Sequence, residues 1–446
     1  MARRNNRRRG PPRAPAELSI ESLAQDGRGV ARLDGKAVFV AGGLPGERVR
    51  AAFTQTHRDY DEAEAEAVLA ASPERVEPRC PHYGVCGGCS LQHLAPEAQI
   101  AAKQRALLEA LSRIGGVAPE RVLEPLTAPV WGYRRKARLG VRYVAKKGRV
   151  LIGFRERQGR LLADLARCEV LVPEVGERFG ELASLIEGLS VREQIPQIEV
   201  MAGDGTISLV FRHLEPLNDD DRARLTAFAQ DTGLFVALQP GGPDTIVPLW
   251  PEAQPLSYAQ PDFGTHVDFR PGDFIQVNAG INRQMVVRAL ELLDVRPDMD
   301  VLELFSGLGN FTLPLLARGA RVVAVEGDPA MTERAARNAI ANGLAGAEQH
   351  AADLFAPDPK APWLTRRYDR VLLDPPRSGA REMLPYIARL APARIVYVSC
   401  DPATLARDAG ELAKVHGYRL EAAGVMDMFP HTAHVESIAL FVRPGA

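Results

Sequence analysis

The chain contains, at positions 303–310, the run Glu303-Leu304-Phe305-Ser306-Gly307-Leu308-Gly309-Asn310, in which an expected apolar strand ends in a glycine loop. From residue 266 onward, such strands alternate with helices. The expected strands span residues 300–305, 321–326, 348–351, 370–374 and 394–399, the expected helices include 329–341 and 382–390, and a final β-hairpin spans 419–426 and 436–443. This order predicts an α/β fold with a doubly wound, mainly parallel sheet, whose ligands bind beyond the carboxyl ends of the strands.

The glycine loop is compatible with two classes of cofactor site. Gly307 and Gly309 allow the backbone to approach a ligand closely before a helix begins. The third glycine of the dinucleotide-binding fingerprint is missing, because Thr312 stands where it would fall. Glu326 ends the second strand and is placed to accept hydrogen bonds from both hydroxyls of a ribose. These features fit either NAD or S-adenosylmethionine.

Three further motifs are expected at the same edge of the sheet. The fourth strand ends in Leu372-Leu373-Asp374-Pro375-Pro376-Arg377, which suits methyltransferases that hold a planar base against the methyl donor; a simple strand-ending turn is the alternative. The fifth strand delivers Cys400, an isolated thiol that indicates either a nucleophile or a small buried hydrophobe. The last hairpin offers His431, His434 and Glu436. We expect the histidines to be structural and Glu436 to be a base or a salt-bridged surface residue.

The N-terminal part is expected to form short strands. They span residues 17–23, 30–33, 36–40 and 47–53, and Asp34-Gly35 is a hairpin signal. This density of alternating strands within residues 16–70 predicts a small β-barrel. Residues 71–95 are rich in proline, glycine and cysteine, whereas the apolar spacing of residues 96–114 predicts a helix.

A second β-rich segment is expected at residues 125–260. Its opening, residues 131–149, carries eight basic residues and no acidic one. At strand spacing, one face presents Arg134, Lys136, Arg138 and Arg142. Such a face, backed by apolar side chains, predicts a surface that contacts a series of phosphate groups; a merely solvated strand face is the alternative.

Composition places the chain among globular proteins. Its 446 residues exceed one ordinary core, so two or three domains are expected. The net charge is −1, but residues 1–13 hold six arginines and no acidic residue, and we expect a disordered arm that either contacts nucleic acid or is simply solvated. No apolar stretch approaches the roughly 18 residues that a membrane span needs. No signal-peptide segment follows the arm, so a cytoplasmic location is expected.

Four of the five cysteines are candidate metal ligands. Cys80, Cys86 and Cys89 lie close together, and Cys168 lies well downstream. A cytosolic protein with few cysteines uses them for metal binding or catalysis more often than for disulfides. The spacing is compatible with zinc or with a four-iron cluster. Four ligands would fill every iron, which favours a structural cluster, because radical S-adenosylmethionine enzymes use three cysteines at a different spacing.

Taken together, the sequence resembles the RNA uracil-C5 methyltransferases, most closely their bacterial 23S ribosomal RNA branch with an iron–sulfur cluster. The resemblance covers nearly the whole chain and rests on residues 27–50, the cysteine pattern, Phe274-Ile275-Gln276-Val277-Asn278, the 305–311 loop, Asp374-Pro375-Pro376-Arg377, Ser399-Cys400 and the histidine–glutamate end. It implies a Rossmann-like S-adenosylmethionine-dependent methyltransferase domain, an N-terminal OB-like TRAM barrel and a β-rich central domain with a four-cysteine cluster. The implied boundaries are 1–15 for the disordered basic arm, 16–71 for the TRAM barrel, 72–95 and 125–265 for the central iron–sulfur and RNA-binding domain, and 96–124 and 266–446 for the methyltransferase domain.

The resemblance also implies residue roles by matched position. The S-adenosylmethionine pocket would be lined by Gln276, Phe305, Asn310, Glu326, Asp353 and Asp374. Cys400 would be the nucleophile and Glu436 the base. A [4Fe–4S] cluster would be held by Cys80, Cys86, Cys89 and Cys168. The chain departs from the family pattern at Ser306 and at Asp401, where asparagine is usual, and we expect Asp401 to raise the pKa of the neighbouring thiol.

Methylation of uracil requires this set of groups. Carbon 5 of uracil is a poor nucleophile, and addition of a thiolate at carbon 6 converts the ring into an enolate that can attack the methyl donor. A base must then remove the carbon-5 proton so that the thiol is expelled. A base stacked inside folded RNA cannot enter such a site, so the target must be flipped out or lie in a loop.

Three alternatives to a 23S ribosomal RNA methyltransferase stay open at this point. They are a transfer RNA uracil-C5 methyltransferase, a radical or redox iron–sulfur enzyme, and a non-catalytic RNA-binding protein. The expected partner is ribosomal RNA, with no membrane and no obligate protein partner.

Overall fold

The computed structural model describes residues 13–157, 159–345 and 347–445. Most of the basic arm expected at residues 1–15 therefore lies outside the described residues. The chain divides into two compact units. The first unit comprises residues Met1–Lys103 and Pro430–His434, and the second comprises Gln104–Phe429 and Val435–Ala446.

The first unit contains a six-stranded sheet wrapped around its own small core. Its strands are β1 (Ala16–Ser19), β2 (Ser22–Leu23), β3 (Gly29–Leu33), β4 (Lys36–Ala41), β5 (Arg48–Thr56) and β6 (Tyr60–Ala70), in the order β1-β5-β6-β4-β3-β2. Asp34 and Gly35, between β3 and β4, have φ angles of 52° and 81°, as a two-residue hairpin turn requires. The hairpin predicted at this dipeptide is therefore confirmed.

The second unit begins with a sheet of order β13-β12-β11-β10-β8-β9. Its strands are β8 (Lys136–Val144), β9 (Arg149–Gly153), β10 (Gln197–Ala202), β11 (Ile207–Arg212), β12 (Phe235–Gln239) and β13 (Val247–Trp250), and its helices are α2 (Pro173–Gly176), α3 (Phe179–Glu187) and α4 (Asp219–Thr232). Along β8, Leu139 and Val141 are buried, whereas Arg138 and Arg142 are exposed. The predicted alternation is confirmed for these four residues, whereas Arg134 and Lys136 of the predicted basic face are only partly exposed. Glu199 on β10 partly neutralises the basic face, because its carboxylate lies 3.4 Å from Arg138.

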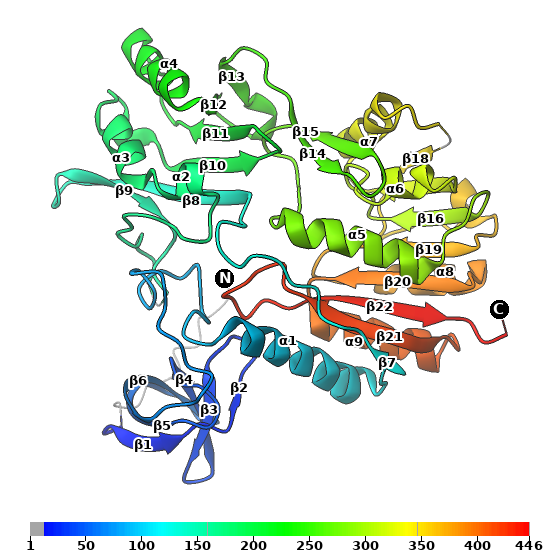
Figure 1. Cartoon of the computed structure of the whole chain (residues 1–446), viewed down its shortest axis with the longest axis horizontal. Coiled ribbons are helices and arrows are strands. Elements are labelled where there is room, and N and C mark those ends of the chain that lie inside the picture. The colour runs from blue at the N-terminus through cyan, green and yellow to red at the C-terminus, as the bar shows by residue number, and fades with distance from the viewer. Residues whose placement is uncertain (1–12, 158, 346, 446) are drawn as a thin grey trace, which may run out of the picture. The chain divides into compact units, whose positions relative to one another are not determined.

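The second sheet of this unit has the order β18-β17-β16-β19-β20-β22-β21-β7, and Figure 1 shows its central strands β16, β19, β20 and β22 in succession. The strands are β7 (Arg121–Val122), β16 (Asp300–Leu304), β17 (Arg321–Glu326), β18 (Ala347–Ala351), β19 (Arg370–Leu373), β20 (Arg394–Ser399), β21 (Arg419–Met426) and β22 (Glu436–Val442). Strands β16 to β20 are parallel, and β22 runs antiparallel between β20 and β21. A separate hairpin pairs β14 (Leu256–Gln260) with β15 (Thr265–Phe269).

The helices that connect these strands begin at the residues that cap them. Asn278 caps α5 (Ala279–Leu293), Asp328 caps α7 (Pro329–Ala341) and Asp401 caps α9 (Pro402–Lys414), each accepting backbone N–H donors of the first turn. Proline follows the cap in α7 and α9, where its missing N–H costs nothing. The remaining helices are α1 (Pro96–Ala110), α6 (Thr312–Ala317) and α8 (Leu384–Leu390).

Expected and observed elements differ mainly at helix ends and in one strand. The helix expected at residues 96–114 is α-helical to Ala110, continues as one π turn and stops at Gly116, whose φ is 60°. The helix expected at 382–390 begins at Leu384, after a 3₁₀ turn. Strand β6 was not expected, because its repeated glutamate and alanine residues favour helix when read alone.

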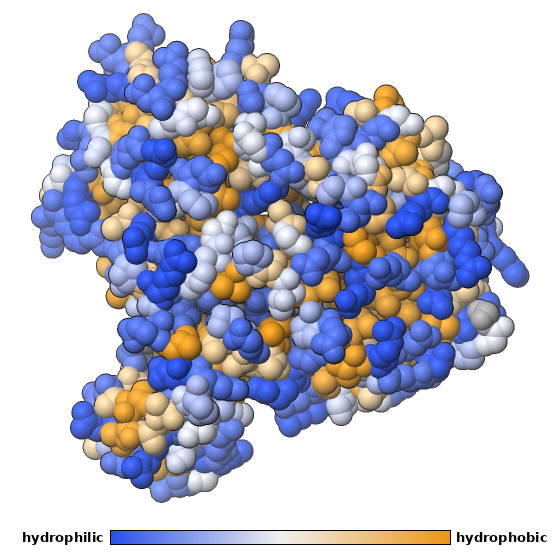
Figure 2. Space-filling view, in the orientation of Figure 1, coloured by the Kyte–Doolittle hydropathy of each residue, from blue (hydrophilic) through white to orange (hydrophobic). Residues whose placement is uncertain are grey.

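The surface visible in Figure 2 is mostly hydrophilic, in keeping with a charged content of 25%. Within the described part of the chain, no helix combines the length and the apolar character that crossing a bilayer would require.

Candidate active site

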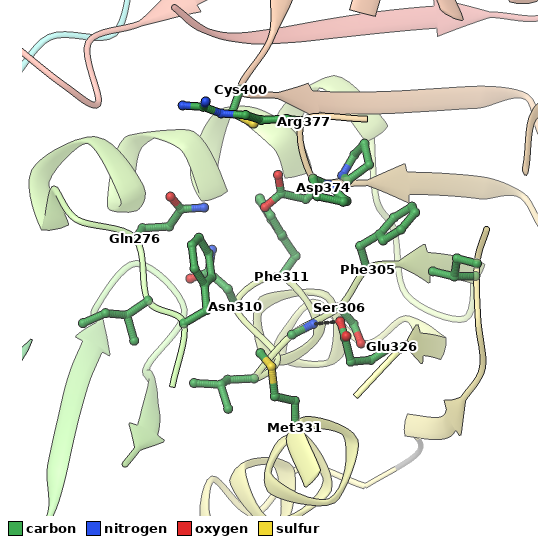
Figure 3. A pocket seen from close by; sticks show the side chains of 18 of the residues that line it. Gln276, Phe305, Ser306, Asn310, Phe311, Glu326, Met331, Asp374, Arg377 and Cys400 are labelled. Atoms are coloured by element: carbon green, nitrogen blue, oxygen red, sulfur yellow. Dashed lines mark hydrogen bonds between the residues drawn. The ribbon is translucent and has the colours of Figure 1, made fainter. Parts of the chain in front are cut away.

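A cavity of about 520 Å³ lies in the second unit, at the carboxyl edge of strands β16, β17, β19 and β20 (Figure 3). The six expected cofactor-binding residues and the two expected catalytic residues all line it. These residues are Gln276, Phe305, Asn310, Glu326, Asp353, Asp374, Cys400 and Glu436. The structure therefore brings the set together, whereas the role of each residue stays a prediction.

The glycine loop after β16 forms one wall of the cavity. Gly307 and Gly309 have φ angles of 57° and 94°, which only glycine adopts without strain. Phe305 also has a positive φ, 63°, and a residue with a side chain pays about 1 kcal/mol or more for this conformation. Its ring centroid lies 5.8 Å from that of Phe355, so the strained residue contributes to an aromatic wall.

Glu326 is fixed at the end of β17 by the same loop. Its Oε2 accepts the N–H of Gly307 at 2.9 Å, drawn as a dashed line in Figure 3, and its Oε1 accepts the N–H of Asp328 at 3.0 Å. A carboxylate has further acceptor capacity beyond these two bonds. Glu326 can therefore still accept hydrogen bonds from ligand hydroxyls in the cavity.

Asn310 anchors the loop from behind. Its Oδ1 accepts the hydroxyl of Tyr258 at 3.0 Å and the Nδ2 of Asn282 at 2.9 Å, and its Nδ2 donates to Asn282 Oδ1 at 2.9 Å. The amide is thus engaged with α5 and with the β14–β15 hairpin. Asn310 holds the loop in place more than it offers polar atoms to a ligand.

Gln276 and Asp353 lie on two further walls of the cavity. Gln276 precedes the cap of α5, and its side chain points into the cavity in Figure 3. Asp353 is exposed, and its Oδ1 accepts the N–H of Phe355 at 2.8 Å. This bond orders the turn that carries the Phe355 ring.

Cys400 and Glu436 come from neighbouring antiparallel strands. The ladder of β20 and β22 pairs Ser399 with Ser437, and the next step in this register places Cys400 opposite Glu436. Both residues line the cavity, and Glu436 is only 9% exposed. In Figure 3, Cys400 lies beside Arg377, and Asp374 lies below them, toward the cavity.

The electrostatics around the thiol disfavour the thiolate. Burial, followed by the carboxylates of Glu436 and Asp374, raises the pKa of Cys400 to about 11, and Arg377 acts in the opposite direction. Burial, followed by Glu436, also raises the pKa of Asp374 to about 7. At neutral pH the thiol is therefore protonated, and a nucleophilic role requires that a neighbouring group take its proton.

Asp401 was expected to act on the Cys400 thiol, but its carboxylate is engaged at the start of α9. Its Oδ1 accepts the N–H groups of Ala403 at 2.9 Å and Thr404 at 3.1 Å, so the carboxylate caps α9. The carboxylates that act on the Cys400 thiol are Glu436 and Asp374.

His431 belongs to the first unit, where its N–H donates to Gln99 Oε1 at 2.8 Å.

Sequence reasoning missed several groups at this site. Glu303 on β16 is fully buried, accepts the Thr312 hydroxyl at 2.6 Å, and burial raises its pKa to about 8. Glu303 itself does not line the cavity, and the cavity-lining residues to which the sequence assigned no role include Tyr258, Phe274, Ser306, Met331 and Arg377. Phe274 and Arg377 lie within motifs already recognised, so a signal for them existed; Tyr258 comes from the β14–β15 hairpin and had none.

The cysteines expected to bind metal lie outside this cavity. Cys80, Cys86 and Cys89 belong to the first unit and Cys168 to the second. None of the chain's five cysteines forms a disulfide. The N–H of Gly88 lies 3.4 Å from Cys86 Sγ, and burial raises the pKa of Cys86, with a smaller contribution from Cys80. Among the described residues, no group of three or more histidine, cysteine, aspartate or glutamate side chains is arranged to hold a metal ion.

Known proteins resemble the chain over nearly its whole length. A family described as tRNA (uracil-5-)-methyltransferase matches residues 261–348 and 364–443, and the TRAM domain matches residues 16–66. The 23S rRNA (uracil(1939)-C(5))-methyltransferase RlmD of Alkalilimnicola ehrlichii is 57% identical, with 98% of each chain covered. That of Alcanivorax borkumensis is 53% identical, with 99% of each chain covered. The crystal structure of Pyrococcus abyssi tRNA (uracil-54, C5)-methyltransferase with S-adenosyl-L-homocysteine has a TM-score of 0.72 at 24% identity, covering 96% of this chain and 99% of that one, which shows the same fold.

Proposed function

Because the chain belongs to the RNA uracil-C5 methyltransferase family, we propose that it transfers a methyl group from S-adenosylmethionine to carbon 5 of a specific uridine in 23S ribosomal RNA. The observation that carries this proposal is the single cavity in which Cys400 and Glu436 meet the glycine loop and Glu326. The choice of substrate is supported by sequence identities of 57% and 53%, over nearly the whole chain, to enzymes named for 23S ribosomal RNA.

Cys400 is the proposed nucleophile. Its proton first passes through a neighbouring carboxylate to solvent, which leaves Glu436 able to accept a proton later. The sulfur of Cys400 then adds to carbon 6 of the uracil, so that the ring electrons move to carbon 5. S-adenosylmethionine bound in this cavity would supply the methyl group to carbon 5, and its sulfur would keep the electron pair of the broken carbon–sulfur bond and leave as the thioether of S-adenosylhomocysteine. Glu436 then removes the carbon-5 proton, the carbon–sulfur bond breaks, and the electron pair returns to Cys400. Each proton and electron pair is thereby accounted for.

The proposed cofactor-binding residues contact different parts of S-adenosylmethionine. Glu326 accepts the ribose hydroxyls, because its carboxylate is held at the cavity wall by Gly307 and Asp328. Phe305 and Phe355 offer apolar faces to the adenine. Gln276, Asn310, Asp353 and Asp374 complete the proposed pocket.

We further propose that Cys80, Cys86, Cys89 and Cys168 hold a [4Fe–4S] cluster. The donor set fits such a group, since thiolates are its usual ligands and none of these cysteines is in a disulfide. The N–H of Gly88 near Cys86 Sγ is also suitable, because hydrogen bonds to sulfur tune such clusters. The cluster would stabilise the irregular segment around residues 80–89 and would take no part in methyl transfer.

The remaining parts of the chain are proposed to bind RNA. The domain boundaries implied by the resemblance assign this task to the TRAM barrel at residues 16–71 and to the central domain at 72–95 and 125–265. Arg138 and Arg142, exposed on β8, would contact phosphates. With ribosomal RNA as substrate, we place the enzyme in the cytoplasm.

The test is methylation of defined RNAs by the purified protein. Transcripts of 23S ribosomal RNA and of transfer RNA are incubated with labelled S-adenosylmethionine, and the modified base is identified by mass spectrometry. The proposal expects 5-methyluridine in the 23S transcript without added reductant. Label in the transfer RNA alone would overturn the substrate, and a requirement for reductant would favour a radical enzyme. RNA that contains 5-fluorouridine should form a covalent adduct with wild type and none with Cys400→Ala, because fluorine at carbon 5 cannot leave as a proton.

A further inference from the structure

Asp408, on helix α9, is a fully buried carboxylate outside the cavity. Its Oδ2 accepts the Tyr397 hydroxyl at 2.7 Å and the Ala380 N–H at 2.9 Å. Its Oδ1 accepts Arg407 Nε at 2.8 Å and lies 2.7 Å from Arg407 Nη2. Removal of a carboxylate from water is costly, so one with donors on both oxygens indicates a specific structural task.

The partners of Asp408 lie next to the proposed nucleophile. Tyr397 is on β20, three positions before Cys400, and burial raises the pKa of its phenol, which keeps it a donor. Helix α9 itself begins directly after Cys400 and its cap. The Asp408 carboxylate therefore connects α9, on which it lies, to β20, the strand that ends at Cys400, through its hydrogen bond with Tyr397.

The Asp408 carboxylate also binds the turn at residues 378–380, which follows Arg377, because it accepts the Ala380 N–H. Arg407 Nη2 also donates to the Ser378 carbonyl at 2.9 Å. Gly379, between Ser378 and Ala380, has a φ of 81°, and a Cβ there would lie 2.6 Å from Asp408 Oδ2 and 2.6 Å from Arg407 Nη2. The turn therefore packs so closely against α9 that a side chain at position 379 would clash with Asp408 and Arg407, so this position requires glycine.

We propose that Asp408 is a positioning residue, which holds Arg377 at a fixed place beside Cys400 through Tyr397 and the 378–380 turn. The proposal rests on the nucleophilic role of Cys400 proposed above. The charged groups around the thiol are Glu436 from β22, Asp374 after β19, Arg377 in the turn and Asp401 at the start of α9. Burial, Glu436 and Asp374 raise the pKa of Cys400 and Arg377 lowers it, so the position of Arg377 affects how easily the thiol loses its proton.

The test is Asp408→Asn, since asparagine has one acceptor oxygen and cannot satisfy donors on both sides. Alkylation of Cys400 by iodoacetamide is followed from pH 6 to 11 by mass spectrometry of the Cys400 peptide, which separates it from the other cysteines. The alkylation midpoint is the pH at which half of Cys400 is alkylated in a fixed, long reaction time, so it lies below the thiol pKa of about 11 and within this range. We expect this midpoint to rise by about one pH unit. We also expect kcat to fall by about tenfold while the Kd for S-adenosylmethionine stays within about twofold.

Asp221→Asn is the matched control. Asp221 is a buried aspartate of α4, and its two oxygens accept the N–H of Ser190 at 2.7 Å and the hydroxyl of Ser190 at 2.6 Å. It is remote from the cavity residues in the fold, because it packs α4 on the other sheet of the unit. We expect Asp221→Asn to lower Tm and to leave the Cys400 alkylation midpoint and kcat unchanged.

Tyr397→Phe keeps the test decisive if Asp408→Asn does not fold, because it deletes one hydroxyl and preserves the packing. It should shift the alkylation midpoint in the same direction by a smaller amount. If the folded variants lose Tm as the control does but keep the wild-type midpoint and kcat, the role of Asp408 is structural only and the proposal is overturned. A failure of the proposed function can be told apart from a failure of this proposal. If Cys400 is not the nucleophile, Cys400→Ala still methylates RNA, whereas the alkylation assay tests the role of Asp408 without any methyl transfer.

Discussion

Cys400 and Glu436 lie opposite each other at the end of an antiparallel ladder, one step beyond the pair Ser399 and Ser437. This register follows from the insertion of β22 between β20 and β21, which returns the chain to the edge where the parallel strands end. The thiol and the carboxylate are therefore fixed by backbone pairing and not by loops. Since Glu436 also raises the pKa of Cys400, one residue affects both the first and the last proton transfer of the proposed reaction.

Glu436→Gln should separate these two effects. Loss of the base blocks removal of the carbon-5 proton, so turnover should fall by about a hundredfold or more and a methylated protein–RNA adduct should accumulate. Denaturing gels with labelled S-adenosylmethionine would reveal this slowly migrating species. Glu333→Gln, which changes an exposed glutamate of α7, is the control and should form none. Lost turnover without any adduct would contradict the role of Glu436 as base.

The same variant should make the free thiol more acidic. Glu436 raises the pKa of Cys400, so its neutral replacement should lower the pH at which Cys400 is alkylated by about one unit or more. The variant would thus have a more reactive thiol and a slower reaction. An alkylation midpoint that stays at the wild-type pH would show that Glu436 does not act on the thiol.

Glu326→Gln should weaken cofactor binding without unfolding the loop. Glutamine can still accept the Gly307 N–H through its one oxygen, but it cannot accept from Asp328 N–H and two ribose hydroxyls as well. We expect the Kd for S-adenosylmethionine, measured by calorimetry, to rise by about tenfold or more. Asp328→Asn keeps the cap of α7 and removes a charge nearby, so it should leave the Kd within about twofold.

The sequence predicts those parts of the site in which local signals and sheet topology agree. Glu326, Asp374 and Cys400 each end a continuous apolar run, and parallel strands bring their carboxyl ends to one edge. Glu436 could be placed there only once a returning hairpin was expected. Their convergence on one cavity is what the structure adds.

Other groups could not be predicted, because tertiary packing defines their roles. Glu303 stands in an apolar strand and gives no sign in the sequence that it will be fully buried behind the glycine loop. Asp408 has the sequence pattern of an ordinary helical aspartate, and only the approach of Tyr397 and Ala380 reveals its task. Asp401 was expected to act on its neighbour Cys400, but the N–H groups of the next turn engage its carboxylate.

Glu303 should make stability depend on pH. Burial raises its pKa from 4.5 to about 8 in the folded state, so the folded chain holds a proton that the unfolded chain releases between these values. The stabilisation from this proton is complete below about pH 4.5 and is lost as pH rises through about 8. The neutral variant Glu303→Gln lacks this loss, because glutamine can still accept the Thr312 hydroxyl and does not ionise.

Urea unfolding of wild type and Glu303→Gln at pH 5, 7 and 9 would measure the effect. We expect the free energy of unfolding of the variant to gain on that of wild type as pH rises, by on the order of a few kcal/mol at pH 9. Asp353→Asn, at an exposed site, should show no such trend. A constant difference between Glu303→Gln and wild type across this range would show that Glu303 is ionised in the folded protein.

The last prediction concerns the cysteines. Residues 71–95 contain little regular secondary structure, so few backbone ladders stabilise the segment that carries Cys80, Cys86 and Cys89. Loss of one ligand should therefore unfold this region locally and leave the distant cofactor cavity intact. We expect Cys89→Ala and Cys168→Ala to lose brown colour and most RNA binding, with the Kd for S-adenosylmethionine within about threefold of wild type. Cys400→Ala is the matched control, because it removes a thiol from the cavity and should keep both colour and RNA binding. Metal and sulfide analysis of anaerobically purified protein is the decisive measurement: one zinc per chain with no iron or sulfide would exclude the iron–sulfur cluster and leave the methyltransferase proposal untouched.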